Sequence, residues 1–502
     1  MMEVLQYLFS GFTVALQPNN LFFCFIGTLL GTVVGILPGI GPIGTMSILL
    51  PLTFHMSPIS SLIMLAGIYY GSMYGGTITS VLINIPGEAA SVVTCLDGYQ
   101  MAKQGRAGPA LGIAAIGSFI AGTLGLIGLM FFAAPLSELG LRFGPPEYFS
   151  VVLLGLTLVV YLTQGSPLKG LVMTVLGLIL STIGLDTISA SPRMTFNTMY
   201  LWDGIELVPL AMGLFGVSEI LANIEKGVVL EVVTRKIGNI YPSIQDWMKV
   251  KWALVRGTII GFFLGILPGG GPVVASFVCY SVEKRISSTP ERFGKGAIEG
   301  VAAPESANNS AVSGAFVPFL TLGIPPNPTM AMLYGAFLIH GLQPGPFLIT
   351  EHPDVFWGLV SSMYIGNGML LVLNLPLIPL WVRILKIPYA ILSPIILLFC
   401  IIGSYSVRGN VLDVFVMMLF GIVGYLFGKF GYEPAPLMLA YVLGPMFEKN
   451  LRQSLLMSQG DFSIFFTRPI SAVAFGLAIL FFITSLYFFV YKRRKQMTAG
   501  SG

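Results

Sequence analysis

The chain has 502 residues, of which 55% are hydrophobic and 10% are charged, and its formal net charge is +4. A soluble domain carries about 25% charged residues, so this composition excludes an ordinary soluble protein and predicts an all-α polytopic membrane protein in a lipid bilayer. Nothing in the composition supports nucleic acid binding. The four cysteines and three histidines show no metal or disulfide spacing, so we expect no metal centre and no organic cofactor.

Residues 1–20 are predicted to form a short helix that either spans the membrane or lies at its surface. A glycine- and proline-rich motif follows, GILPGIGP at 35–42, and it recurs as GILPGGGP at 265–272. The apolar arms around both motifs are shorter than the about 20 residues that a span needs. Each motif therefore predicts a re-entrant hairpin of two short helices, which enters and leaves by the same face of the membrane.

The tips of these hairpins are candidate anion sites. Unwound backbone in a membrane is tolerated only against protein or a watery cavity. The prolines are placed to open the second arm, and the glycines leave amides bare at a helix N-terminus, where the helix dipole favours an anion. We predict a carboxylate-binding site from the two tips, comprising Gly39, Ile40, Gly41, Pro42, Gly269, Gly270, Gly271 and Pro272.

After each hairpin runs an interrupted apolar segment, 61–102 with a break at 84–88, and 296–340 with a polar run at 305–310 and a break at 324–329. A carboxylate at the membrane midplane costs about 2 to 3 kcal/mol, so these polar groups should face a cavity or partners. The predicted site therefore also includes the substrate-binding residues Asn84, Gly87, Asn327 and Thr329. The candidate cation ligands are Thr77, Thr79, Ser80, Glu88, Glu305, Ser306, Asn308, Asn309 and Ser310.

Several of these polar residues could have a purely structural role instead of binding a substrate or a cation. A single Ser or Thr in such a helix more often packs or bonds back to the preceding turn. Glu88, Glu299 and Glu305 are either proton carriers or paired structural acids, and Asp97 is interpreted as a helix-end group.

The distribution of Lys and Arg predicts the topology. None occurs in residues 1–102, so the loops there face outward, whereas the first basic loop, at 103–106, faces the cytoplasm. Four spans then return the chain to a basic stretch, so the second hairpin opens on the opposite side from the first. The two repeats are therefore predicted to be inverted, an arrangement typical of secondary transporters.

The predicted organisation has seven parts. These are a short N-terminal helix (1–20), the first hairpin and broken helix (21–109), scaffold helices (110–224), a cytoplasmic connection (225–256), the second hairpin and broken helix (257–346), further scaffold helices (355–491) and a cytoplasmic tail (492–502).

Several motifs together resemble the large membrane subunit of the tripartite tricarboxylate transporter family. They are GILPGIGP at 35–42, MYGGT at 73–77, NIPGE at 84–88, DGYQ at 97–100, GRAG at 105–108, ESANN at 305–309 and GLQPGP at 341–346. The resemblance implies a multi-pass protein of the bacterial inner membrane that works with a small membrane subunit and a periplasmic solute-binding protein. It also implies import of an organic carboxylate, driven by a cation gradient. A second proline at Pro326 departs from the family pattern and leaves the choice among tricarboxylates, dicarboxylates and aromatic carboxylates open.

We therefore expect a secondary active transporter for a small di- or tricarboxylate, coupled to Na⁺ or H⁺, with an elevator-type movement of the hairpin core. A passive carboxylate channel or facilitator is the first alternative. An intramembrane enzyme is the second, and it would need convergent acid, base or metal groups that the broken segments do not offer.

Overall fold

The computed structural model describes residues 2–37, 41–163, 166–186, 188–226, 239–384 and 389–499. Helices dominate this part of the chain, and its only strands, β1 (Gly184–Leu185) and β2 (Pro192–Arg193), form a short antiparallel pair after α8. Seven of the described helical segments are long and apolar enough to cross a membrane. The prediction of an all-α polytopic membrane protein is confirmed.

The helices run in the following order. The first half contains α1 (Met2–Ala15), α2 (Pro18–Ile36), α3 (Gly41–Leu49), η1 (Leu50–His55), α4 (Pro58–Ile83), η2 (Ala89–Ser91), α5 (Val92–Lys103), α6 (Ala107–Gly140), α7 (Pro145–Leu162), α8 (Pro167–Ser181), η3 (Met199–Leu201), α9 (Leu207–Ala211), the π-helical turn η4 (Met212–Val217) and α10 (Ser218–Lys226). The second half contains α11 (Ile244–Ile266), α12 (Gly271–Ile286), η5 (Pro290–Arg292), α13 (Glu299–Leu322), α14 (Pro328–Ile339), α15 (Leu348–Glu351), α16 (Pro353–Asn374), α17 (Ile378–Ile384), α18 (Tyr389–Arg408), α19 (Val411–Lys429), α20 (Pro434–Met457), α21 (Ile464–Thr467) and α22 (Pro469–Ala499).

The same order of elements occurs twice: a pair of helices, then a long helix and a break. The second pair is joined at a Gly/Pro tip, whereas residues 38–40, between α2 and α3, lie outside the described residues. The expectation of two short arms is wrong for the first arm of each pair, because α2 has 19 residues and α11 has 23. By length and hydropathy α2 is a candidate span in its own right. Only the second arms, α3 and α12, are shorter, with 9 and 16 residues. The lengths of these two helices were underestimated because both begin in sequence that is not apolar. Helix α2 begins at residues 18–20, and α11 begins in a charged turn capped by Ser243.

The long helices that follow, α4 and α13, are the buried centre of the fold. Both are buried along almost their whole length, and α13 buries the polar run 305–310 as well as its apolar side chains. Helix α4 is followed by the C-cap residue Asn84, whose φ of 58° is left-handed, and α13 by the C-cap residue Gly323, whose φ is 72°. Because α13 is continuous over its 24 residues, the polar run 305–310 is not a break and lies inside a helix.

Each first arm packs on its central helix through glycines four residues apart. Gly27, Gly31 and Gly35 of α2 face the backbone of α4, and Gly257, Gly261 and Gly265 of α11 face the backbone of α13. Small residues at this spacing allow helix backbones to approach closely in a membrane. The two stripes lie at equivalent positions of the two motifs, which supports an internal repeat; its inverted orientation and the domain boundaries remain predictions.

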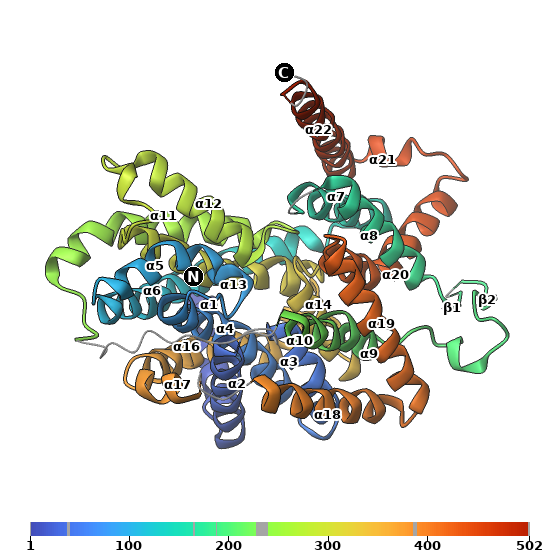
Figure 1. Ribbon diagram of the computed structural model, residues 1–502. Helices are drawn as coiled ribbons and strands as arrows, with labels where there is room; N and C mark the ends of the chain where they lie inside the picture. The colour runs from blue at the N-terminus through green and yellow to red at the C-terminus, as the bar shows by residue number, and fades with distance from the viewer. Residues whose placement is uncertain are drawn as a thin grey trace.

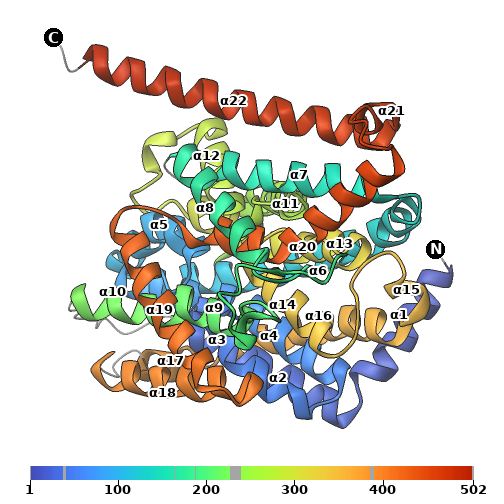
Figure 2. The same ribbon diagram turned by 90° about the vertical axis from the view of Figure 1, so that its right-hand side faces the viewer.

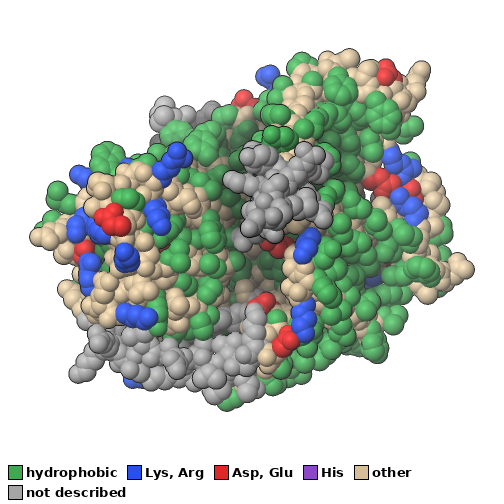
Figure 3. Space-filling view, turned by 45° about the horizontal axis from the view of Figure 1, so that its top comes forward, with side chains coloured by type: hydrophobic (Ala, Val, Ile, Leu, Met, Phe, Trp, Pro, Cys, Tyr) green, Lys and Arg blue, Asp and Glu red, His purple; other side chains and the backbone are tan. Residues whose placement is uncertain are grey.

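The elements form two groups. In Figure 1, α2, α4, α5, α6, α11, α12, α13 and α16 gather on the left, whereas α7, α8, α19 and α20 lie on the right. Contacts join α13 to α6 and α11 in the first group and α20 to α7 and α8 in the second. Figure 2 shows the long helix α22 lying across α7, with which it packs. Figure 3 shows a hollow between a more polar part and a largely hydrophobic part of one face.

The loop that contains β1 and β2 is fixed by ion pairs to the end of α20. Arg452 contacts Asp186 at 2.6 Å, and Arg193 contacts Glu448 at 2.7 Å. The backbone N–H groups of Ser189 and Ile188, together with Arg452, hold the pKa of Asp186 well below its usual range. Arg193 and Arg452 are therefore both paired within the protein.

The glycine stripe on α11 generates a stability prediction. A Cβ at Gly261 would lie 2.2 Å from the carbonyl oxygen of Ala307, so Gly261→Val must push α11 and α13 apart. Overpacking of this kind costs about 1 to 3 kcal/mol, and we expect a clearly lower thermal unfolding midpoint in detergent. Gly476→Ala is the control, because nothing lies within 4 Å of that Cβ position. Equal midpoints for the two variants would contradict this packing.

Candidate functional site

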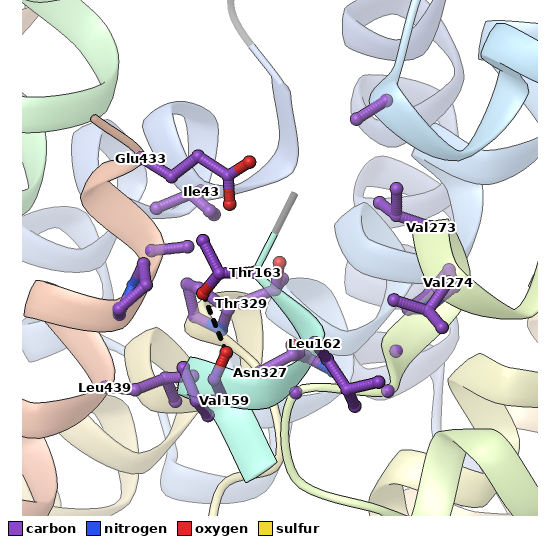
Figure 4. A pocket seen from close by; sticks show the side chains of 18 of the residues that line it. Ile43, Val159, Leu162, Thr163, Val273, Val274, Asn327, Thr329, Glu433 and Leu439 are labelled. Carbon is purple, nitrogen blue, oxygen red and sulfur yellow. Dashed lines mark hydrogen bonds between the residues drawn. The ribbon is translucent and has the colours of Figure 1, made fainter. Parts of the chain in front are cut away.

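A cavity of about 390 Å³ lies where the two groups of helices meet. Its walls come from the tip of the second hairpin, the breaks after α4 and α13, the end of α7 and the start of α20. The lining residues include Tyr69, Met73, Glu88, Ala89, Val159, Thr163, Gly269, Gly270, Gly271, Pro272, Asn327, Thr329 and Glu433. Figure 4 shows this cavity, with Glu433 and Leu439 on one side and Val273 and Val274 on the other. Its volume suits a small organic ligand.

The tip of the second hairpin is held against the second break. The backbone N–H of Gly269 donates to the carbonyl of Pro326 at 2.8 Å. Gly269 and Gly271 have φ values of 79° and 49°, which glycine adopts at little cost. The chain turns there and starts α12 directly at the cavity wall, with Pro272 in the first turn, where a missing N–H is harmless.

Three substantial helices begin at this cavity. They are α12, α14 and α20, which start at Gly271, Pro328 and Pro434. Each N-terminus carries the positive end of a helix dipole. Its first-turn amides have no partner within the helix, except that the prolines at these starts have no N–H and the N–H of Met330 is capped by Asn327. No Lys or Arg lines the cavity in the described part of the chain, whereas the carboxylates of Glu88 and Glu433 do. An anion here would be held by amides and helix dipoles, close to two acidic side chains.

Asn327 joins the second break to α4. Its side-chain oxygen caps α14 by accepting from the N–H of Met330 at 3.0 Å, and its amide nitrogen donates to the hydroxyl of Tyr69 at 3.0 Å. The side chain is buried, with 8% of its surface exposed. It therefore fixes the position of the helix N-terminus that faces the cavity.

The predicted substrate residues divide into two sets. Gly269, Gly270, Gly271, Pro272, Asn327 and Thr329 line the cavity, as does Glu88, which was assigned to the cation. Gly41, Pro42, Asn84 and Gly87 are not among the lining residues, although Ile43 of the first hairpin is. Asn84 is an exposed helix C-cap, and Gly87 packs against the carbonyl of Gly35. Gly39 and Ile40 lie outside the described residues.

The cavity walls that come from outside the repeats were not predicted from the sequence. Val159, Leu162 and Thr163 end α7, and residues 433–436 begin α20. The run Glu-Pro-Ala-Pro at 433–436 is a helix-start signal that was available in the sequence. Tyr69 and Met73 were missed because they lie in an uninterrupted apolar stretch of α4.

A cluster of polar side chains lies between α4, α5 and α13, around the fully buried Glu305. Its carboxylate accepts from the hydroxyls of Thr77, at 2.6 Å, and Thr94, and from the amide of Asn308 at 3.3 Å. Asn309 donates to the hydroxyl of Ser118 at 2.8 Å. Four of the predicted cation ligands, Thr77, Glu305, Asn308 and Asn309, thus form one hydrogen-bonded cluster.

The other predicted cation ligands are outside this cluster. The hydroxyls of Thr79 and Ser306 bond to the carbonyls of Gly76 and Ala302 in their own helices. Ser310 donates to the carbonyl of Thr258. Ser80 bonds to Ser91, the residue that closes the turn after the first break. Groups of three or more His, Cys, Asp or Glu side chains suited to a metal do not occur in the described ranges.

Comparison with known proteins identifies the family. Residues 21–439 match the model of the tripartite tricarboxylate transporter TctA family. The chain belongs to the TctA family. It is 51% identical to the "Uncharacterized 52.8 kDa protein in TAR-I ttuC' 3'region" of Agrobacterium vitis, over 95% of this chain and 96% of that protein. It is also 51% identical to the "Uncharacterized protein in TAR-II ttuC' 3'region" of the same organism, over 47% of this chain and 98% of that protein. No solved structure matches.

Membership of the TctA family makes this chain a subunit of a transporter. Its long apolar helices indicate that the chain crosses the membrane several times. The word tripartite in the family description implies partner subunits. The predicted family resemblance is confirmed.

The Glu305 cluster in this TctA-family chain generates a second prediction. Glu305→Ala removes the shared acceptor of three buried hydrogen bonds, from Thr77, Thr94 and Asn308, and we expect the free energy of unfolding to fall by about 3 kcal/mol or more. Thr321→Ala on the same helix is the control, because that buried hydroxyl bonds only to the carbonyl of Val317. Denaturant unfolding in detergent measures both, and a loss as small as that of the control would show that the cluster adds no stability.

Proposed function

We propose that this chain is the transport subunit of a binding-protein-dependent secondary transporter, which imports a small di- or tricarboxylate. It lies in the bacterial inner membrane with its C-terminus in the cytoplasm. A periplasmic solute-binding protein delivers the substrate, and a small membrane subunit completes the complex. A gradient of Na⁺ or H⁺ drives uptake.

The observation that carries this proposal is the convergence of three helix N-termini on one cavity without a basic side chain. Amides and helix dipoles stabilise a carboxylate in a low-dielectric site. A site that uses helix dipoles in place of Arg or Lys does not neutralise the negative charge of the bound carboxylate. A cation bound to the same protein would then compensate that charge. Discontinuous helices at a repeat interface are the usual setting for such paired sites.

The position of the cavity supports an elevator-type mechanism. Its walls are shared between the hairpin and break of the first group and α7 and α20 of the second. A movement of one group against the other would open this boundary to alternate sides of the membrane. A channel has no need of such a divided site.

Uptake of labelled di- and tricarboxylates tests the proposal. Proteoliposomes would hold this chain, its small membrane partner and its binding protein, with Na⁺ and pH gradients imposed separately. We expect concentrative uptake that follows one gradient. Uptake that only equilibrates and ignores both gradients would leave a facilitator or channel as the function.

The same assay tests the cavity through Asn327→Asp. The variant keeps the oxygen that caps α14 but adds a negative charge to the lining, and like charges brought together cost several kcal/mol. We expect carboxylate uptake to fall by about tenfold or more. Asn84→Asp is the matched control, since it changes the asparagine at the other break, which is exposed and outside the cavity lining. Equal uptake by the two variants would place the substrate elsewhere.

Cross-linking tests the movement. Cysteines at Thr163 of α7 and Val273 of α12 lie on opposite groups and both line the cavity. The native cysteines 24, 95, 279 and 400 are all buried, so a bifunctional thiol reagent should select the introduced pair. We expect the cross-link to stop uptake, whereas the two single-cysteine variants treated alike retain it. Undiminished uptake by the cross-linked protein would rule out relative movement of α7 and α12.

A further inference from the structure

A small cavity beside the Glu305 cluster has the features of an ion site. Its volume is about 10 Å³, and its polar lining comes from Tyr74, Thr77, Ser118 and Asn374. That space is sufficient for one water molecule or one small ion. Leu111, Ala114 and Ala115 of α6 close the apolar side.

The side-chain oxygen of Asn374 is buried and has no hydrogen-bond donor. The orientation of its amide is fixed, because the nitrogen donates to the carbonyl of Leu370 at 2.9 Å. An unpaired buried acceptor costs about 1 to 3 kcal/mol. Such a group in a native structure calls for a ligand that the protein side chains do not supply.

The hydroxyl hydrogens around this space are all used elsewhere. Tyr74 donates to Asn367 at 2.6 Å and Thr77 donates to Glu305 at 2.6 Å. Ser118 donates to the backbone carbonyl of Glu305 at 3.4 Å. A hydroxyl has one hydrogen and two lone pairs, so these residues and Asn374 offer the cavity only acceptors. A single water has two hydrogens to give, whereas a cation is attracted to every oxygen.

The charge of Glu305 points the same way. The side chain is fully buried, and the ion pairs found in the described part of the chain do not include it. It accepts three hydrogen bonds, as an ionised carboxylate does. A buried charge without an opposite charge is costly, and Thr77 places this carboxylate one hydrogen bond from the small cavity.

We propose that the space between Tyr74, Thr77, Ser118 and Asn374 holds a dehydrated Na⁺ ion, which neutralises the Glu305 carboxylate. Hydroxyl and amide oxygens are the ligands a hard cation takes. This inference rests on the proposed function and deepens it, since the ion is the one whose gradient drives uptake. It adds Tyr74, Ser118 and Asn374 to the residues that the sequence singled out.

Direct Na⁺ binding to the purified full-length chain tests the site without substrate or partner subunits. Binding of radioactive Na⁺ and the rise of the unfolding midpoint with NaCl are measured, with choline chloride keeping the ionic strength constant. We expect saturable Na⁺ binding, and Asn374→Leu and Tyr74→Phe should each weaken it by about tenfold or more, because each removes one coordinating oxygen.

The stability of the variants without Na⁺ guards against simple misfolding. Asn374→Leu removes the orphaned oxygen at similar volume, so its midpoint in choline should equal or exceed that of the wild type. Asn20→Ala is the matched control, because its amide is also buried but its oxygen already accepts from Ser60. It should lower the midpoint without changing Na⁺ affinity.

Two results would overturn the proposal. One is wild-type Na⁺ affinity in both Asn374→Leu and Tyr74→Phe, and the other is no Na⁺ binding by the wild type, which would indicate a water or a protonated Glu305. The outcomes separate this site from the proposed function. If Na⁺ binding depends on these residues but uptake only equilibrates, the ion site is supported and active transport is ruled out. If Na⁺ drives uptake but Asn374→Leu binds Na⁺ as the wild type does, active transport is supported and this ion site is ruled out.

Discussion

The fold depends on one constraint: inside a bilayer every backbone amide and carbonyl must find a partner. The protein unwinds its chain at only a few places among the described spans, and each of them faces protein or a cavity. The second hairpin tip and the break after α13 satisfy one another through the bond from Gly269 to Pro326. The first break is closed by the Glu88 and Ser91 capping interactions. Amides in the first turns of helices have no partner within the helix, and the proposed carboxylate site depends on those that face the cavity.

Close packing of the central helices makes these breaks possible. The glycine stripes bring α2 close to α4 and α11 close to α13, and Gly87 at the first break packs against the carbonyl of Gly35. Asp97 adds a polar tie, since its carboxylate accepts from the N–H groups of Gly294, Gly296 and Ala297 and from Tyr280. It links α5 to the start of α13 and therefore does more than end a helix.

Composition was sufficient to predict the helical class, and glycine and proline punctuation predicted the second hairpin tip and both breaks, because these residues act locally. Long-range features were harder to read. Asn84 and Asn327 both sit at breaks, yet only Asn327 lines the cavity, since the first closes a helix in a left-handed conformation and the second caps one. The contributions of α7 and α20 come from sequence-distant helices that carry no repeated motif. Asn374 is one polar residue in a largely apolar helix, and only the packing around it leaves its oxygen unpaired.

The substrate cavity and the proposed ion site share the same rigid elements. Helix α4 presents Tyr69 and Met73 to the cavity and Tyr74 and Thr77 to the small polar space. Helix α13 carries Glu305 and ends at the break that positions Asn327. A shift of α4 or α13 that improves one site must therefore change the other, and such coupling of two binding free energies is necessarily reciprocal. In the proposed function the two ligands carry opposite charges, so each would favour the binding of the other, which is the energetic requirement for symport.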